Sequence, residues 1–275
     1  MSEAPSLTVE KAIANINQKQ DLGLRYYAAW WLGKFRVKTD QAITALIEAL
    51  EDEEDIAPDG GYPLRRNAAK ALGKLDDRRA IAPLINCLSC DDYYVRESAA
   101  QSLEMLGDRR AIVPLRDLLA LGITEGNLND YALETVEGKP HLNQPYEAII
   151  EALGSLEAKN ELNLVQPFLN HPLPKVKYAA QRAMYQLTGD GVYGEMLVDA
   201  LGGKDLQLRR SALMDLGAVG YVASARAIAS TLAENSLKLI AMKGLLEHQV
   251  KEDQKNQVSL SDRSIEVMEL MDSLL

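Results

Sequence analysis

Apolar residues recur along the chain at intervals of four, within segments of about thirty residues. Two segments make this clear: LRRNAAKALGKLDDRRAIAPL from Leu64 and VRESAAQSLEMLGDRRAIVPL from Val95 align without a gap, 95 − 64 = 31 residues apart. Apolar side chains at positions i, i+4 and i+8 lie on one face of a helix. Each segment therefore predicts an amphipathic helix, a turn and a second, shorter helix.

The same frame recurs in seven units. Their first positions are Leu24, Leu64, Val95, Pro145, Val176, Leu208 and Leu237. A small residue follows four places later in most units, and a large apolar residue eight places later. A unit of this size cannot bury its own apolar face and must stack on its neighbours. The sequence therefore predicts an all-α fold, a right-handed α-solenoid of about seven HEAT-like helical hairpins.

Glycine and proline suggest where the helices end and begin. Four units carry a glycine nine places after their first position: Gly33, Gly73, Gly154 and Gly217. We interpret these glycines as left-handed caps at the C-terminus of each first helix. Prolines in the first turn of the second helix fit there because the missing N–H has no partner to lose. These prolines are Pro83, Pro114 and Pro167.

The spacing between units predicts the domain organisation. Two gaps are long, which places insertions at residues 51–63 and 122–144. We expect one solenoid domain over 1–275, with a cap helix at 7–20, repeats at 24–249, a polar linker at 250–261 and a last helix at 262–275. Insertions in a solenoid fall on loops at one edge, often the binding edge.

Charge and hydropathy exclude several classes of ligand. The net charge is −10 and 25% of residues are charged, so the dense basic face that binds nucleic acid is not expected. No apolar run approaches the roughly 20 residues that span a bilayer. The polar, acidic start does not resemble a signal peptide. We therefore expect a cytosolic protein with no nucleic-acid partner and no membrane span.

Residues with reactive side chains are few. Cys87 and Cys90 form a C-x-x-C pair at the end of a second helix, with neither a βαβ pattern nor two further zinc ligands nearby, so we interpret them as structural. We interpret His171 and His248 in the same way. His141 lies in the second insertion, which makes it the functional candidate among the histidines. No metal site is expected.

The repeat also sorts the arginines. Those at the second position are Arg25, Arg65, Arg96 and Arg209. Because these four arginines occupy the same position of the repeat, we expect each of them to form a structural ion pair or to cap a helix. The third position varies, which suggests exposure, so Arg66, Tyr178 and Arg210 are freer to contact a ligand.

An aromatic cluster lies in the first unit: Tyr26, Tyr27, Trp30 and Trp31. Packing in the core of that unit is the default interpretation. Anchoring a planar ligand or a partner protein is the alternative.

Two segments beside the insertions, GGYPLRRNAAKALGKL from Gly60 and KPHLNQPYEAIIEALG from Lys139, together with the Asp-Arg-Arg-Ala-Ile-x-Pro repeats, resemble a known family. It is the E subunit of the E/F-type heterodimeric phycobilin lyases of cyanobacteria, and within it the phycocyanobilin lyases for the phycocyanin α-subunit. The resemblance covers nearly the whole chain. It implies an F-type partner subunit, apo-phycocyanin α-subunit as acceptor, and phycocyanobilin bound as substrate rather than cofactor.

The resemblance implies a reaction that needs no enzyme nucleophile. A cysteine of the acceptor adds to the bilin's ring A and forms a thioether, so the lyase must hold, orient and protonate the bilin. Such a ligand needs cations for its propionates, a carboxylate for its pyrrole nitrogens and aromatic walls. We predict that both insertions supply them. The predicted catalytic residues are His141, Asp130 and Tyr146, and the predicted bilin-binding residues are Tyr62, Arg66, Asp59 and Tyr131.

A second hypothesis remains open at the level of sequence. The same repeats suit a non-catalytic adaptor or chaperone for phycobiliprotein subunits, because a fold alone does not imply a function. The apolar segments near residues 7–16 and 265–275 are candidate docking elements in either case.

Overall fold

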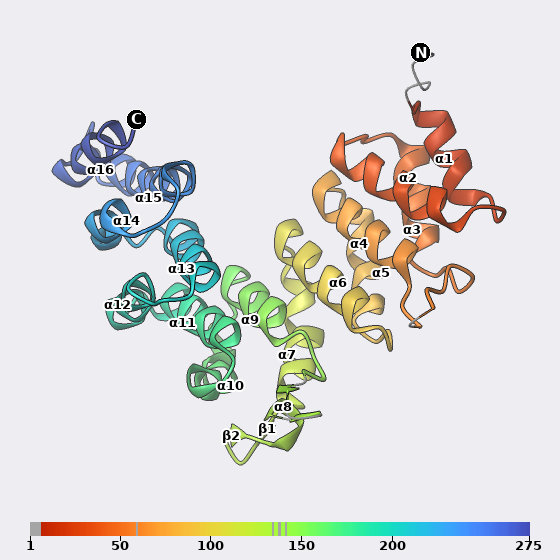
Figure 1. Ribbon diagram of the computed structural model, residues 1–275, viewed down its shortest axis with the longest axis horizontal. Helices are drawn as coiled ribbons and strands as arrows, with labels where there is room; N and C mark the ends of the chain where they lie inside the picture. Colours follow the sequence, from red (N-terminus) through yellow and green to blue (C-terminus); the bar gives the residue numbers. More distant parts are fainter. Residues whose placement is uncertain (1–6, 59, 134, 137–138, 141) are drawn as a thin grey trace. The chain divides into compact units, whose positions relative to one another are not determined.

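The structure, a computed structural model, describes residues 7–58, 60–133, 135–136, 139–140 and 142–275. Its contacts divide the chain into two compact units: residues 1–122 with 129–156, and residues 123–128 with 157–275. Both are stacks of HEAT-like helical hairpins (Figure 1), which confirms the predicted all-α repeat fold. No described helix combines the length and the apolarity needed to cross a membrane.

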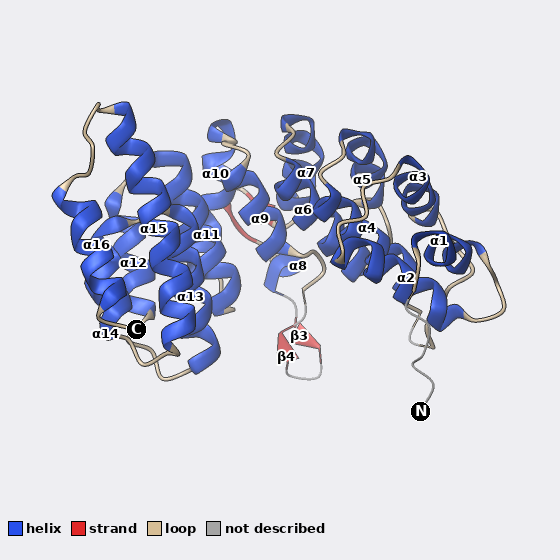
Figure 2. Ribbon diagram, turned by 90° about the horizontal axis from the view of Figure 1, so that it is seen from above, coloured by secondary structure: helices blue, strands red, loops and turns tan. Residues whose placement is uncertain are grey.

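Unit 1 consists of two layers of helices. The first layer holds α2 (Leu22–Lys34), α4 (Pro63–Leu75), α6 (Tyr93–Leu106) and α9 (Tyr146–Ser155), each packed on the next. The second holds α3 (Asp40–Ala49), α5 (Ile81–Cys87) and α7 (Ile112–Ala120), and α1 (Val9–Asn17) packs on α2 and α3. Figure 2 shows these helices and the short α8 (Asp130–Leu133) from above. Strands β3 (Thr135–Val136) and β4 (Lys139–Pro140) pair antiparallel in the second insertion.

Unit 2 continues the pattern. Its first-layer helices are α11 (Pro174–Thr188), α13 (Leu206–Val219) and α15 (Asn235–Lys255), which are packed with α12 (Gly191–Ala200), α14 (Ala225–Ser230) and α16 (Asp262–Asp272). A short α10 (Leu162–Val165) and a 3-10 turn (Gln166–Asn170) precede α11, and the hairpin of β1 (Ile123–Thr124) and β2 (Asn127–Leu128) belongs to this unit. The buried side chains of Leu197, Leu213, Leu216, Met242 and Val267 form its core.

The repeated Asp-Arg-Arg-Ala-Ile motif forms the turn between the two helices of a hairpin. Asp77 accepts a hydrogen bond from the backbone N–H of Arg79 at 2.9 Å, and Asp108 accepts one from Arg110 at 3.0 Å. Each aspartate thereby satisfies a donor at the start of a 3-10 turn that leads into the second helix. The motif is thus a capping device of the repeat.

The four repeat glycines do not cap their helices, so that prediction was wrong. All four lie within helices: Gly33, Gly73, Gly154 and Gly217. The left-handed caps of the first-layer helices are other residues, namely Asp76 after α4, Gly107 after α6, Gly189 after α11 and Gly220 after α13. A Cβ on Gly33 would lie 2.7 Å from Cα of Ala71 in α4. On Gly73 it would lie 2.7 Å from Cβ of Ser102 in α6. These glycines therefore allow close approach of consecutive first-layer helices.

The second-position arginines do hold the backbone, as predicted. Arg25 donates from Nε to the carbonyl of Ile16 at 2.8 Å and from Nη2 to Asp52 at 2.6 Å. Arg209 donates from Nη1 to the carbonyl of Gly203 at 2.6 Å. Lys238 uses the same position to reach the carbonyl of Ala229 at 2.9 Å. The basic residue at the second position of these three units thus secures the chain that leads into its helix.

Two other expectations were wrong. Helix α15 extends to Lys255, so half of the predicted linker is helical. Four of the six residues at 250–255 are Lys, Glu or Gln, which have high helix propensity. The buried Asp253 accepts hydrogen bonds from Ser261 and Ser264 at the start of α16. Core packing is wrong for Tyr26, Tyr27 and Trp30, which are 40%, 46% and 42% exposed. Only Trp31 of that cluster is half-buried, against Phe35.

Candidate functional site

Both insertions return to the same place in unit 1, the N-terminal end of α6. Asp92 caps this helix by accepting from the N–H of Tyr94 at 2.7 Å and of Val95 at 3.3 Å. Its other oxygen accepts from the N–H of Tyr62 at 2.7 Å. Tyr62 is the last residue before α4. One carboxylate therefore joins the end of the first insertion to the start of α6.

Arg96, one turn into α6, holds the second insertion. Its Nη2 donates to the carbonyl of Asn143 at 2.8 Å, and its Nε donates to Oε1 of Gln144 at 3.0 Å. Gln144 in turn donates to the hydroxyl of Tyr131 at 3.2 Å, and the Asn143 amide donates to the carbonyl of Tyr131 at 3.0 Å. Tyr131 is thereby tied to the same helix end as Tyr62.

Arginine and tyrosine side chains alternate on this surface. The Arg66 guanidinium lies 4.8 Å from the centre of the Tyr94 ring, and that of Arg65 lies 5.0 Å from the Tyr62 ring. Tyr94 is 52% exposed and meets Tyr93 edge-on at 5.4 Å. Cation–π contact fixes the guanidinium while leaving its N–H donors in the ring plane available. The surface therefore offers an oriented cation beside an exposed aromatic ring.

The outward positions of the first-layer helices form three rows in unit 1. The aromatic row, on α2, is Tyr26 and Trp30. The basic row, on α4, is Arg66, Lys70 and Lys74. The acidic row, on α6 and α9, is Glu97, Glu147 and Glu151. Because the helices pack side by side in the same direction, with Gly33 against Ala71 and Gly73 against Ser102, the rows are neighbours.

The predicted site residues lie in different environments. Tyr62 and Arg66 are half-buried at the N-terminal end of α4, while Asp130 and Tyr131 are exposed on α8. Tyr146 is fully buried: a Cβ on Gly122 would lie 2.9 Å from its hydroxyl oxygen. Burial, and to a lesser degree the nearby Tyr131, raises the pKa of Tyr146. Asp59 and His141 lie outside the described residues, and the roles of all seven stay predictions.

Sequence reasoning did not select Tyr94, Lys70 or Glu97. The repeat itself carried the signal for two of them, because Lys70 lies one turn after Arg66 and Glu97 occupies the same repeat position as Arg66. Tyr94 precedes the first position of its unit, where the repeat frame assigns no role.

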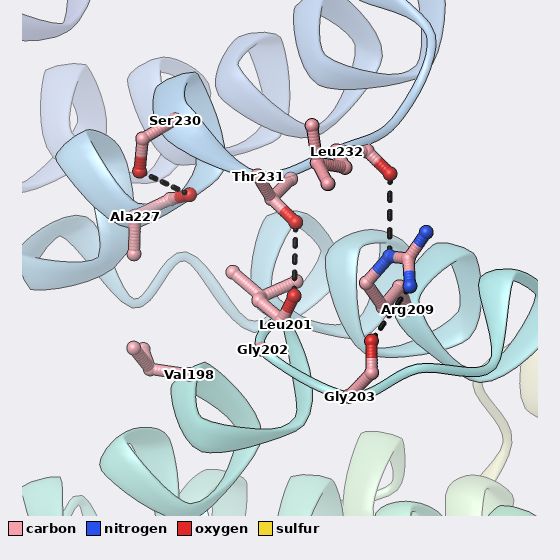
Figure 3. Close-up of a pocket in the computed structure, with 9 residues that line it drawn as sticks. All are labelled: Val198, Leu201, Gly202, Gly203, Arg209, Ala227, Ser230, Thr231 and Leu232. Carbon is pink, nitrogen blue, oxygen red and sulfur yellow. Dashed lines mark hydrogen bonds between the residues drawn. The ribbon is translucent and has the colours of Figure 1, made fainter.

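Unit 2 contains a pocket that makes a poor alternative site. Its volume is about 340 Å³, at the small end of ligand pockets. Figure 3 shows how its polar groups are used: Arg209 donates to the carbonyls of Gly203 at 2.6 Å and Leu232 at 3.2 Å, and the Thr231 hydroxyl donates to the carbonyl of Leu201 at 3.0 Å. These bonds hold α14 to the turn between α12 and α13. The polar groups that line the pocket are therefore used to stabilise the repeat, and they are not available to bind a ligand.

Metal chemistry finds no support among the residues that the structure describes. No three His, Cys, Asp or Glu side chains gather there in a way that could hold an ion. Cys87 and Cys90 are both free, and burial raises the pKa of the Cys87 thiol to about 11. A buried thiol that stays protonated is a weak nucleophile, in agreement with the structural role expected for it.

Comparison with known proteins agrees with the geometry of the repeats. Residues 55–122 match the family model for HEAT repeats, and residues 24–52 match the PBS lyase HEAT-like repeat. The chain is 60% identical to the phycocyanobilin lyase subunit alpha of Nostoc sp. over 98% of this chain and 95% of that protein. It is 58% identical to the protein of the same name from Synechocystis sp., over 98% and 97%.

More distant and structural comparisons point the same way. The bilin biosynthesis protein PecE of Nostoc sp. is 40% identical over 90% of this chain and 89% of that protein. The solved complex of CpcE and CpcF of phycocyanin lyase, also from Nostoc sp., contains a chain that matches with a TM-score of 0.88 and 59% identity, over 100% of this chain and 97% of that one. This chain belongs to the family of phycocyanobilin lyase alpha subunits.

Proposed function

We propose that this chain is the alpha, or E-type, subunit of a phycocyanobilin lyase. With an F-type partner it attaches phycocyanobilin to a cysteine of the apo-phycocyanin α-subunit. Support comes from 55–60% identity to six named alpha subunits, across nearly the full length of this chain. The solved CpcE–CpcF complex supports a heterodimer. A cytoplasmic location accords with the two unbridged cysteines.

The single observation that carries a bilin role for unit 1 is the Arg66–Tyr94 pair between the two insertion ends. A bilin is a planar, largely apolar tetrapyrrole with two propionates. The oriented guanidinium suits a propionate, and the exposed ring suits a pyrrole face. Glu97, in the next row, places a carboxylate where pyrrole N–H groups can donate. One surface thus offers a cation for a propionate, an aromatic ring for a pyrrole face and a carboxylate for the pyrrole N–H groups.

The reaction is an addition and needs no leaving group. The acceptor's thiolate sulfur bonds to the exocyclic carbon of the ring A ethylidene group, the double bond is lost, and a proton adds to the neighbouring ring carbon. The thiol supplies the atoms, so neither oxidant nor reductant is consumed. The lyase contributes by holding the bilin in the reactive geometry and by assisting the proton transfer.

Asp130 is our candidate for that proton transfer among the described residues, because it is exposed beside Tyr131 on α8. Tyr146 is enclosed below the same segment, and we assign it to support Gly122 and Ala132. Asp130→Asn is therefore expected to slow attachment without weakening bilin binding. Tyr146→Phe tests the catalytic role predicted for that hydroxyl.

Reconstitution tests the function. This chain, its F-type partner, phycocyanobilin and apo-phycocyanin α-subunit are mixed, and the visible spectrum is recorded after denaturation. A covalent phycocyanobilin adduct that requires both chains is the expected result. Tight binding of the apo-subunit without any adduct would instead indicate an adaptor or chaperone.

A further inference from the structure

The basic row of α4 is a concentration of positive charge that the described residues leave without an ion-pair partner. Arg66, Lys70 and Lys74 follow one another at intervals of four, and none of them forms an ion pair within the described part of the chain. The acidic row is close enough for Glu97 to favour the charged form of Lys70, but burial and the charges of Arg66 and Lys74 outweigh it and lower the pKa of Lys70.

This arrangement is unfavourable for the isolated chain. Like charges four residues apart on a helix repel, and partial burial of the Lys70 amine adds to that cost. An anion bound along the row would remove both penalties. An ion pair with Glu97 alone would leave two of the three cations uncompensated.

The aromatic row gives the second, independent observation. Tyr26 and Trp30 stand on the outward face of α2, next to the basic row, and Trp30 stacks on Tyr27 at 5.4 Å. Leu22, one turn before Tyr26, is 39% exposed and shares that helix face, so α2 presents apolar side chains to solvent at intervals of four. Exposed apolar side chains gathered on one face favour a binding site.

We propose that α2 and α4 form the surface that orients the bilin: the basic row takes the two propionates, and Tyr26 and Trp30 stack against the tetrapyrrole. This inference rests on the proposed function and adds residues to it. Helices pack at about 8–10 Å, so a flat ligand lying across the pair meets both rows. Lys70 and Trp30 are then positioning residues for the attachment reaction.

The neighbouring rows argue against a longer polyanion. The acidic row on α6 and α9 lies beside the basic row and would repel an extended phosphate backbone or acidic peptide. Only a narrow strip of positive charge remains, bordered by aromatic rings on one side and carboxylates on the other. Such a strip suits a small dianion with an apolar body.

The test compares two ligands on the lyase heterodimer. Phycocyanobilin carries free propionates, whereas its dimethyl ester keeps the tetrapyrrole but loses both charges. Binding of each is followed by titration of the visible absorbance. We expect Arg66→Gln and Lys70→Gln to weaken binding of the free acid by about tenfold each. Binding of the ester should change by less than about twofold, because the variants then remove nothing that it uses.

Matched variants separate charge from general damage. Lys243→Gln removes an exposed lysine at the same repeat position in α15, where Glu247 pairs with it at 3.5 Å, and should leave both affinities unchanged. Trp30→Ala should weaken the acid and the ester alike, by about tenfold, as loss of stacking predicts. An equal loss for acid and ester in Lys70→Gln, or no loss in either, would overturn the propionate assignment.

The proposal and the underlying function fail in different ways. If the heterodimer binds the free acid with the predicted charge dependence but forms no adduct, the lyase function fails and the binding surface stands. If adducts form at an unchanged rate in the Arg66→Gln/Lys70→Gln double variant at limiting bilin concentration, the function stands and the surface is wrong.

Discussion

Replacing Gly33 by alanine tests how the repeats stack. The new Cβ would lie 2.7 Å from Cα and 2.8 Å from Cβ of Ala71, about 1 Å inside the usual separation of non-bonded carbons. Neither atom can rotate away, so α2 and α4 must separate. Overpacking of this kind costs about 1–3 kcal/mol, and the better helix propensity of alanine returns up to about 1 kcal/mol. With the full return, the net loss should be up to about 2 kcal/mol.

The chain provides its own probe for this experiment. Its two tryptophans, Trp30 and Trp31, both lie in α2, so urea unfolding followed by tryptophan fluorescence reports on unit 1. Gly191→Ala, in α12 of unit 2, is the control, because its Cβ would make only an ordinary 3.5 Å contact with the Tyr221 hydroxyl. Its unfolding is followed by circular dichroism, since the tryptophans report on unit 1 alone. That variant should be neutral or stabilised by up to about 1 kcal/mol.

Asparagine distinguishes the packing role from the capping role that the sequence suggested. A left-handed cap accepts asparagine readily, so a capping glycine would make Gly33→Asn the milder change. A packing glycine makes it the more damaging one, because the side chain is larger. Stabilisation by Gly33→Ala, or greater tolerance of asparagine than of alanine, would refute the reasoning.

Four further predictions concern single side chains. Arg25→Ala should cost about 3 kcal/mol in urea unfolding because it removes a buried guanidinium and leaves the half-buried Asp52 without its cation, whereas Lys19→Ala, in an exposed pair, should cost less than about 1 kcal/mol. Burial tends to raise the pKa of Asp52, but hydrogen bonds from Arg25 and two backbone amides hold it below the ordinary 3.8. Its stabilisation is therefore complete above about pH 4, is lost as the pH falls through the folded pKa, and should become smaller in the pH profile of Arg25→Ala, where the two backbone amides remain. Ser264→Ala removes a 2.6 Å hydrogen bond to the Asp253 carboxylate, which ties the start of α16 to α15, so hydrogen exchange should quicken in α16 while α13 stays protected; equal protection in α16 would contradict this anchoring role. Tyr146→Phe should leave the attachment rate unchanged because the hydroxyl is enclosed, and a large rate loss would instead support the predicted catalytic role.

The repeat pattern was sufficient to predict the helices, because their apolar faces must be buried against neighbours. It did not reveal why glycine recurs, since close approach and a left-handed cap select the same residue. The position of Ala71 against Gly33, and of the left-handed residues beyond the glycines, distinguishes the two. In the same way, composition cannot tell a buried aromatic residue from an exposed one. The exposure of Tyr26 and Trp30 follows from how α2 packs on α4, which only the structure shows.

The candidate site was predicted in part. The insertions directed attention to Tyr62, Arg66 and Tyr131. Hydrogen bonds through Asp92, Arg96 and Gln144 bring the two tyrosines to the N-terminal end of α6, and the contact with the Tyr94 ring brings Arg66 there. That convergence depends on contacts between residues 30 to 48 positions apart, which no local pattern encodes. The buried position of Tyr146 depends in the same way on Gly122 and Ala132.

Intact-mass spectrometry of the acceptor tests the central claim most directly. Apo-phycocyanin α-subunit is incubated with phycocyanobilin and either the complete heterodimer or the F-type partner alone, and its mass is followed over time. The account predicts that the acceptor gains the mass of one phycocyanobilin only when this chain is present. It further predicts that the gain slows in the Arg66→Gln/Lys70→Gln variant at limiting bilin concentration. The same gain at the same rate without this chain would contradict the account.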